Sequence, residues 1–231
     1  MNKKTEKELL NIVKRNYMEI ADHYSETRKK HLWPELIKLT ENIKAGSKVL
    51  DVGCGSGKLL TAFENKNINY LGIDPCHELL NSAKAQFPDF KFNTGDIINL
   101  GDINELDYDY VFCIAVLQHI PGKDMQIKAL RQLKNKISQN GKIILSVWNI
   151  WNQEKYQKLI WKFWLLKLIG KNKMNFGDIL FDWKNPAGTS ISKRYYHAFT
   201  IFELKRLIKK SGLRIEQIYK DEFNIFAVLR K

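Results

Sequence analysis

Five short apolar runs alternate with helical patterns between residues 48 and 148, and this alternation constrains the fold more than any other feature. The runs are Lys48–Asp51, Tyr70–Ile73, Phe90–Phe92, Tyr110–Ile114 and Lys142–Val147, with helices expected at Leu59–Glu64, through Leu79–Ala83 and over Lys123–Ile137. Continuous apolar strands are typical of strands buried on both faces, and strand–helix alternation is typical of parallel sheets covered by helices. The sequence therefore predicts an α/β fold with a doubly wound parallel sheet.

The two ends of the chain depart from this alternation. Residues 6–42 predict helices broken near His31–Pro34, and residues 199–211 predict a helix closed by Gly212. Strands near Leu213–Tyr219 and Phe223–Leu229 are expected to form an antiparallel pair. We expect one domain over residues 1–231: a helical cap at 1–44, a cofactor-binding core at 45–148, a helical and aromatic insertion at 149–197, and a C-terminal helix and strand pair at 198–231.

A glycine-rich turn, Asp51-Val-Gly-Cys-Gly-Ser-Gly57, joins the first apolar run to the next helix. Glycine lets the backbone turn sharply and approach a ligand closely, because it has no Cβ. A dinucleotide loop, G-x-G-x-x-G, would have its third glycine at position 58, where this chain has Lys58. Asp51 would also repel a pyrophosphate. The turn therefore favours a ligand without phosphate, such as S-adenosylmethionine (SAM), over the alternative of a purely structural joint.

Two further acids follow the next two apolar runs. Asp74 ends the second run, and Asp96 follows the third within Thr94-Gly-Asp-Ile97. An acid at the end of the second strand accepts hydrogen bonds from the ribose hydroxyls in nucleoside-binding sheets. Asp96 is placed to accept from an adenine amino group with Ile97 against the ring, although a plain loop acid is the alternative.

The glycine turn and the three acids, in this order, resemble the class I SAM-dependent methyltransferase family over about residues 48–148. The resemblance implies a Rossmann-like seven-stranded sheet with helices on both faces, and SAM as the methyl donor. The expected cofactor-binding residues are Arg28, Asp51, Gly53, Gly55, Gly57, Asp74, Pro75, Asp96, Ile97 and Ala115.

Three stretches outside this core resemble the tRNA wobble-uridine carboxymethyl methyltransferases, known as a yeast-type enzyme and as a domain of AlkB-homologue tRNA hydroxylases. They are Tyr17-Met-Glu-Ile-Ala-Asp-His-Tyr-Ser-Glu-Thr-Arg28 with Trp33-Pro34, Ala115-Val-Leu-Gln-His119, and Asp178-Ile-Leu-Phe-Asp-Trp183 with Arg194-Tyr-Tyr-His197. This chain departs from the branch at three places. Gln118 replaces the first of two histidines, the proline that usually precedes Trp183 is absent, and Asn224-Ile-Phe226 replaces an N-W-W-like stretch. The resemblance implies a substrate-binding set of Trp33, Trp183, Arg194, Tyr195, Tyr196 and His197.

The chemistry implied by this branch assigns roles to a few side chains. A carboxylate acceptor is ionised near neutral pH, so orientation and water exclusion matter more than a general base. Arg28 and Arg194 are candidates to grip a carboxylate or phosphate, while a structural salt bridge, or for Arg28 the SAM carboxylate, is the alternative. The catalytic candidates are His119, Arg194 and His197. Either histidine orients the acceptor, acts as a base, or is a packed loop histidine.

Positive charge is concentrated outside the predicted cofactor core. The net charge is +13, with none over residues 45–148 and +6 over residues 149–197. This asymmetry favours a polyanion partner such as tRNA, although a lysine-rich composition on solvated faces is the alternative. The stretch Trp151–Ile169 interleaves lysines with aromatics, and three fates remain open for it: packing as a lid or in a dimer, RNA contact, or, least favoured, membrane-surface contact.

The leading hypothesis is a cytoplasmic enzyme that esterifies a carboxymethyl group on a tRNA wobble uridine. The alternatives are a small-molecule O- or N-methyltransferase with residues 149–197 as a hydrophobic lid, and a non-catalytic SAM-binding subunit. The resemblance also implies a small zinc-binding activator protein as a partner. No apolar stretch is long enough to span a membrane, no signal-peptide core is present, and neither a disulfide framework nor a metal site is expected.

Overall fold

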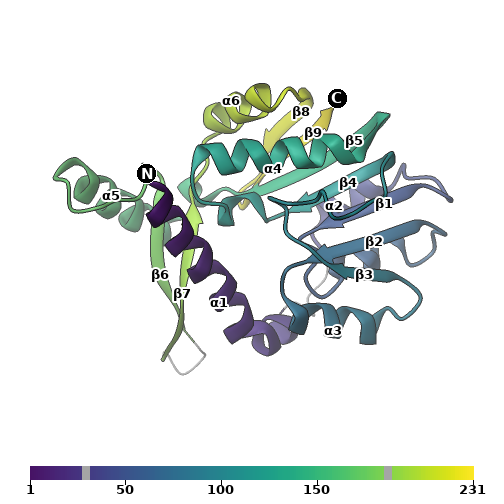
Figure 1. Cartoon of the computed structure of the whole chain (residues 1–231), viewed down its shortest axis with the longest axis horizontal. Coiled ribbons are helices and arrows are strands. Elements are labelled where there is room, and N and C mark those ends of the chain that lie inside the picture. The colour runs from purple at the N-terminus through teal and green to yellow at the C-terminus, as the bar shows by residue number, and fades with distance from the viewer. Residues whose placement is uncertain (28–31, 185–188) are drawn as a thin grey trace.

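A seven-stranded sheet forms the centre of the molecule (Figure 1), in a computed structural model that describes residues 1–27, 32–184 and 189–231. The strand order is β3-β2-β1-β4-β5-β9-β8. The strands are β1 (Lys48–Val52), β2 (Asn69–Asp74), β3 (Lys91–Thr94), β4 (Tyr108–Ile114), β5 (Ile137–Trp148), β8 (Arg214–Lys220) and β9 (Asn224–Arg230). The first five are parallel, whereas β9 runs antiparallel to both β5 and β8. The predicted parallel sheet and terminal antiparallel pair are confirmed.

Helices cover both faces of this sheet, as the alternating apolar runs predicted. They are α1 (Lys3–Thr27), α2 (Pro34–Thr40), α3 (His77–Gln86), α4 (Lys123–Lys136), α5 (Glu154–Leu168) and α6 (Ile201–Ser211), with short 3-10 helices η1 (Lys58–Phe63), η2 (Leu117–His119) and η3 (Ile150–Asn152). Leu50 of β1 packs with residues of α4 and α6, whereas its neighbour Val49 packs with residues of η1 and α3. Successive strand residues point to opposite faces, so β1 is buried between two helical layers.

Local signals place the ends of α6 and α2. The Thr200 hydroxyl caps α6 by accepting a hydrogen bond of 3.1 Å from the Glu203 amide, and Gly212 ends the helix with φ of 80°. α2 begins at Pro34, which suits a first helical turn because proline lacks an N–H. Of the predicted break at His31–Pro34, only His31 lies outside the described residues.

Residues 149–197 contain a structure that the sequence did not predict. Besides α5, they form a two-stranded antiparallel sheet of β6 (Asp178–Lys184) and β7 (Ser190–His197). Its side chains share an apolar cluster with α5, and α1 lies along β7 (Figure 1). The insertion is therefore helix and sheet together, not helical alone. The helix expected after the glycine turn is also only the 3-10 segment η1.

Candidate cofactor and active site

A cavity of about 200 Å³ lies at the carboxyl ends of β1, β2 and β4, with α1 across it. Ligands of doubly wound sheets bind at this edge. The sequence-predicted residues that line it are Gly53, Gly55, Asp74, Pro75, Asp96, Ile97, Ala115 and His119. Eight residues chosen from separate strand ends are thus brought together around one space.

The glycine turn follows β1 and forms the floor of this cavity. Gly53 has φ of 79°, and a Cβ there would collide with the Val116 side chain. The position therefore requires glycine on both conformational and steric grounds. Gly57 does not line the cavity; with φ of 78° it starts η1. The structure thus shows a backbone role for Gly57, and its contact with the cofactor stays a prediction.

Asp74 holds the turn against the end of β2. Its Oδ2 accepts a hydrogen bond of 2.9 Å from the Gly55 amide, and its Oδ1 accepts one of 2.9 Å from the Cys76 amide. Burial raises the pKa of Asp74 to about 6, although these two hydrogen bonds oppose the shift. Among the described residues no lysine or arginine forms an ion pair with it. Its remaining acceptor capacity suits hydroxyl donors of a ligand.

Asp51 lies deeper, at the wall of a second cavity of about 100 Å³ that shares Gly53 and Ala115 with the first. Its Oδ2 accepts a hydrogen bond of 2.9 Å from the Tyr70 hydroxyl. Burial, reinforced by the charge of Asp74, raises the pKa of Asp51 to about 7 despite that bond. The carboxylate is therefore half-ionised near neutral pH, and a nearby cation would favour its charged form.

Asp96 lies on the opposite side of the first cavity. Its Oδ2 is 3.8 Å from the Lys14 ammonium of α1, and its Oδ1 accepts a hydrogen bond of 3.2 Å from the Ile98 amide. Lys14 was not predicted as a site residue. The ion pair is partly exposed, so it contributes little to stability and leaves the carboxylate accessible.

The carboxylates around the cavities fit SAM and disfavour a pyrophosphate. Asp51, Asp74 and Asp96 surround the joined cavities, and Lys14 is the single described cation paired with any of them. SAM carries a sulfonium and an ammonium but no phosphate, so this charge pattern matches it. Ala115 has φ of 55°, a costly conformation for a residue with a Cβ, and such strain is concentrated at functional sites.

His119 forms part of the cavity wall beside α1. Its Nε2 is 2.9 Å from the Tyr17 hydroxyl, and its ring lies 4.8 Å from the Tyr196 ring between centroids. His119 is buried yet lines the cavity. The two tyrosines therefore fix the orientation of a histidine that faces the cavity, and its role toward the acceptor stays a prediction. Tyr17 was missed as a contact because only the packing of α1 reveals it.

Arg194 lies behind Tyr196 and does not line the cavities described. Its Nε donates to Asn16 Oδ1 at 3.0 Å, and its Nη1 donates to the Tyr196 hydroxyl at 2.9 Å. The guanidinium carbon lies 3.7 Å from the centroid of the Trp183 ring. Arg194 is 4 % exposed and has no carboxylate partner among the described residues. The expected direct contacts of Arg194 and Trp183 with substrate stay predictions, and neither side chain lines the cavities described.

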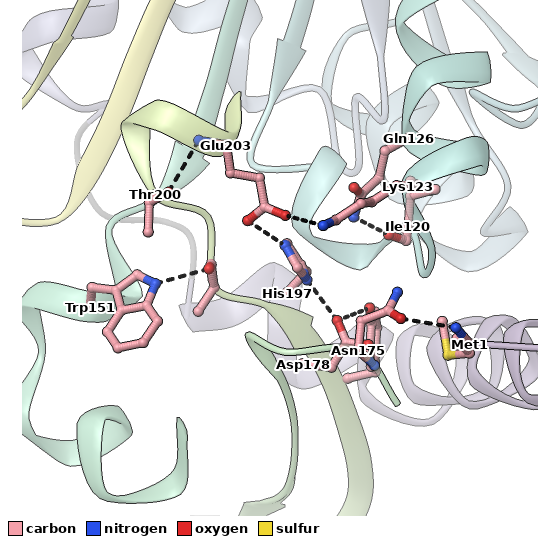
Figure 2. Close-up of polar contacts among 12 residues, drawn as sticks. Met1, Ile120, Lys123, Gln126, Trp151, Asn175, Asp178, His197, Thr200 and Glu203 are labelled. Atoms are coloured by element: carbon pink, nitrogen blue, oxygen red, sulfur yellow. Dashed lines mark hydrogen bonds and ion pairs between the residues drawn. The ribbon is translucent and has the colours of Figure 1, made fainter. Parts of the chain in front are cut away.

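His197 lies in an ionic network on the other face of β7 (Figure 2). Its Nδ1 is 2.6 Å from Asp178 Oδ1, and its Nε2 is 3.0 Å from Glu203 Oε2. Burial would lower the pKa of His197, but these hydrogen bonds and charges outweigh it and raise the pKa to about 9. Lys123 at the start of α4 completes the network, 3.5 Å from Glu203.

This network bears on two predictions. His197 is 1 % exposed and Tyr195, which donates a 2.8 Å hydrogen bond to Asp178, is equally buried. Neither residue lines the cavities described above. The network gives both residues a structural role, joining β6 and β7 to α6, while the catalytic role of His197 and the substrate contact of Tyr195 stay predictions.

The predictions for Arg28, Trp33 and the stretch that forms α5 have different outcomes. Arg28 lies outside the described residues, whereas Trp33 lines the smaller cavity beside Asp51. α5 packs Tyr156 and Ile160 into the insertion, in agreement with a packing role. Its outer face nevertheless exposes apolar side chains: Trp161, Leu165, Leu168 and Ile169.

No helix among the described residues combines the length and apolar character needed to cross a bilayer. Likewise, no group of three or more His, Cys, Asp or Glu side chains in the described ranges is arranged to hold a metal ion.

Comparison with known proteins shows the family to which this chain belongs. The model of the family described as "Methyltransferase domain" matches residues 24–218. A Saccharomyces cerevisiae protein named tRNA (carboxymethyluridine(34)-5-O)-methyltransferase is 32% identical over 148 residues, covering 64% of this chain and 51% of the relative. This chain thus spans about half the length of that relative. A Schizosaccharomyces pombe protein with the same name is 25% identical, covering 93% of this chain and 94% of the relative.

A solved structure shares the fold. A SAM-dependent methyltransferase from Methanosarcina mazei superposes with a TM-score of 0.69 at 18% identity, covering 87% of this chain and 99% of that one. At this identity the likeness shows the arrangement of the sheet and helices.

Proposed function

This chain belongs to the methyltransferase domain family and is a SAM-dependent methyltransferase, and from that premise we propose that it converts a carboxymethyl group on a tRNA wobble uridine to its methyl ester. The predicted family and cofactor are thereby confirmed. The observation that carries the proposal is the acid-lined cavity at the strand ends, which suits a sulfonium nucleoside. The choice of carboxymethyluridine as the acceptor follows from the names of the two fungal relatives.

Different cavity residues bind different parts of the cofactor. Asp74 accepts from the ribose hydroxyls, and Asp96 accepts from the adenine amino group with Ile97 against the ring. Asp51 and the turn at Gly53 hold the methionine end electrostatically. SAM supplies a methyl group activated by its sulfonium charge.

The acceptor requires positioning more than proton removal. A carboxylate is ionised near neutral pH, so it attacks without a general base. His119, oriented by the Tyr17 hydroxyl, donates a hydrogen bond that aligns the acceptor at the cavity wall. α1 covers the cavity and excludes water from the reacting atoms. Hydrolytic side reactions and solvation of the carboxylate are both reduced by that cover.

Arg194 contributes through its neighbour. Its Nη1 donates to the Tyr196 hydroxyl, and the Tyr196 ring packs against His119. We assign it as a positioning residue that keeps His119 directed toward the cavity, in place of the direct carboxylate contact expected from the sequence. Stacking of its guanidinium on the Trp183 ring offsets part of the cost of burying the charge.

The charge distribution supports an RNA acceptor. Residues 149–197 carry +6, and the exposed face of α5 places Lys158 and Lys162 beside Trp161. Cations bind phosphates, and exposed aromatic rings stack on unpaired bases. A small activator protein and a cytoplasmic location remain predictions of the family resemblance.

The test is to incubate the protein with methyl-labelled SAM and tRNA that carries carboxymethyluridine, digest the RNA and identify the labelled nucleoside by mass spectrometry. We expect label in the methyl ester of carboxymethyluridine at the wobble position. Label on another nucleoside, or transfer to free metabolites with none to tRNA, contradicts the proposed acceptor. Asp74→Asn protein is the control without cofactor binding.

A further inference from the structure

A third hollow, of about 470 Å³, adjoins the cofactor cavities at the carboxyl end of β5. Its wall contains three aromatic side chains, Trp33, Trp148 and Phe223, and two amide side chains, Gln153 and Asn224. Trp33 also lines the smaller cofactor cavity, next to Asp51 and the glycine turn. The hollow therefore lies beside the place where the methionine end of the cofactor is expected.

The wall is built on rigid elements. Trp148 is the last residue of β5, and it pairs in register with Asn224, the first residue of β9. Trp33 precedes α2 and packs edge-on against Phe226 of β9, with ring centroids 6.5 Å apart. Gln153 precedes α5. Sheet pairing and two helix starts thus hold these four side chains around the space.

The polar side chains favour a neutral planar ring with donor and acceptor edges. Asn224 is 3 % exposed, and its Oδ1 has no hydrogen-bond partner among the described residues. An unpaired buried carbonyl oxygen is costly until a donor reaches it. Glu35 accepts a hydrogen bond from the Tyr219 hydroxyl, and Asp221 accepts from the Phe223 and Asn224 amides, so both acids on this wall already have partners within the protein. The indole rings offer stacking surface to any base.

We propose that this hollow holds the pyrimidine ring of the target nucleotide, with its 5-substituent directed past Trp33 toward the cofactor. A uracil ring presents one N–H donor between two carbonyl acceptors. Asn224 Oδ1 accepts from that N–H, and the Gln153 amide donates to a ring carbonyl. The ring stacks on Trp148. This assignment rests on the proposed function and adds the residues that recognise the base.

Nucleoside binding tests the assignment without turnover. Protein saturated with S-adenosylhomocysteine is titrated with 5-carboxymethyluridine, uridine and adenosine, with ligand-observed NMR as the readout. The variants are Gln153→Ala and Trp148→Phe; Gln217→Ala, at an exposed position outside the hollow, is the matched control. Stacking and base contacts of this kind are worth ~1–3 kcal/mol, which converts to about 5- to 150-fold in affinity. We expect Gln153→Ala to weaken binding of both uridines by about 5-fold or more, with S-adenosylhomocysteine affinity unchanged.

The outcomes separate this inference from the proposed function. Uridine binding that is lost in Gln153→Ala and kept in Gln217→Ala supports the base site even if no tRNA ester is found. Ester formation on tRNA with an unchanged Michaelis constant for RNA in Gln153→Ala and Trp148→Phe overturns the base site and leaves the proposed function intact. Equal binding of adenosine and uridine also overturns it. Trp148→Phe keeps an aromatic ring at the position, so a folding defect is not expected to mask the result.

Discussion

Asp74→Asn is expected to abolish most cofactor affinity without destabilising the fold. Both carboxylate oxygens of Asp74 accept backbone N–H groups, at 2.9 Å from Gly55 and 2.9 Å from Cys76. In the variant one oxygen becomes an NH₂ group. That group faces a backbone donor instead of accepting from it, and the negative charge offered to the ribose hydroxyls is lost.

The magnitude follows from the number of charged hydrogen bonds removed. Each hydrogen bond to a charged group contributes about 1.5–3 kcal/mol. Loss or weakening of the two that reach the ribose is therefore expected to cost about 2–4 kcal/mol, or ~30- to 1000-fold in affinity. Stability should behave differently. The pKa of Asp74 is raised to about 6 in the folded protein, so its charged form opposes folding above that pH. The neutral amide removes that penalty, which offsets the cost of placing its NH₂ group against a backbone donor, so the variant should melt close to the wild type.

Isothermal titration of S-adenosylhomocysteine at pH 7.5, with thermal unfolding measured in parallel, tests both statements. Asp89→Asn, a substitution of an exposed loop acid, is the matched control and should bind as the wild type does. The reasoning fails if Asp74→Asn binds within threefold of the wild type. It fails equally if binding is lost only because the variant melts well below the wild type.

Three further expectations follow from the same geometry. SAM affinity should fall as pH drops from 7.5 to 5.5, because Asp51 has a pKa of about 7 and becomes protonated over that range. Tyr70→Phe removes a hydrogen bond that lowers the pKa of Asp51, so the midpoint of the affinity–pH curve should move to higher pH. An affinity that does not change with pH excludes the role of Asp51. His197 has a folded pKa of about 9 against an ordinary 6.5, so its stabilising contribution is complete below about pH 6.5 and is lost as pH rises through 9. Chemical unfolding should show a decline of up to about 3 kcal/mol over that range in the wild type relative to His197→Gln, and parallel curves for the two proteins would refute it. Replacement of Lys158 and Lys162 by Gln should weaken binding of an anticodon stem-loop and reduce the salt dependence of the affinity by about two phosphate contacts, with an unaltered salt slope as the contrary result.

The cofactor half of the site could be predicted because its signals are local. Asp51 and Asp74 lie at the ends of the apolar strands β1 and β2, Asp96 follows β3, and parallel strands bring their carboxyl ends to one edge. Gly53 is required by its own backbone conformation and its contact with Val116. Short-range pattern therefore fixes both the residues and their meeting point.

The acceptor half depended on contacts that no local pattern contains. Consecutive residues of a strand face opposite sides, so the stretch from Arg194 to His197 is divided by β7. Arg194 and Tyr196 face Asn16 and His119, whereas Tyr195 and His197 face Asp178. A motif read as one substrate-binding unit is thus split between two environments. The sequence analysis assigned residues 194–197 to one substrate-binding set because it did not predict the β6–β7 sheet.

The side chains missed from the sequence come from α1. Tyr17 and Lys14 reach His119 and Asp96 across more than 80 residues of chain. The sequence predicted helices over residues 6–42, but which strand ends the first helix covers depends on tertiary packing.

The most direct test of the account is a crystal structure of the protein with S-adenosylhomocysteine. The account predicts the ribose hydroxyls on Asp74, the adenine ring between Asp96 and Ile97, and the homocysteine end beside Asp51 and Trp33. A ligand found elsewhere, or one whose ribose does not contact Asp74, would contradict the central claim that the acids at the strand ends form the cofactor site.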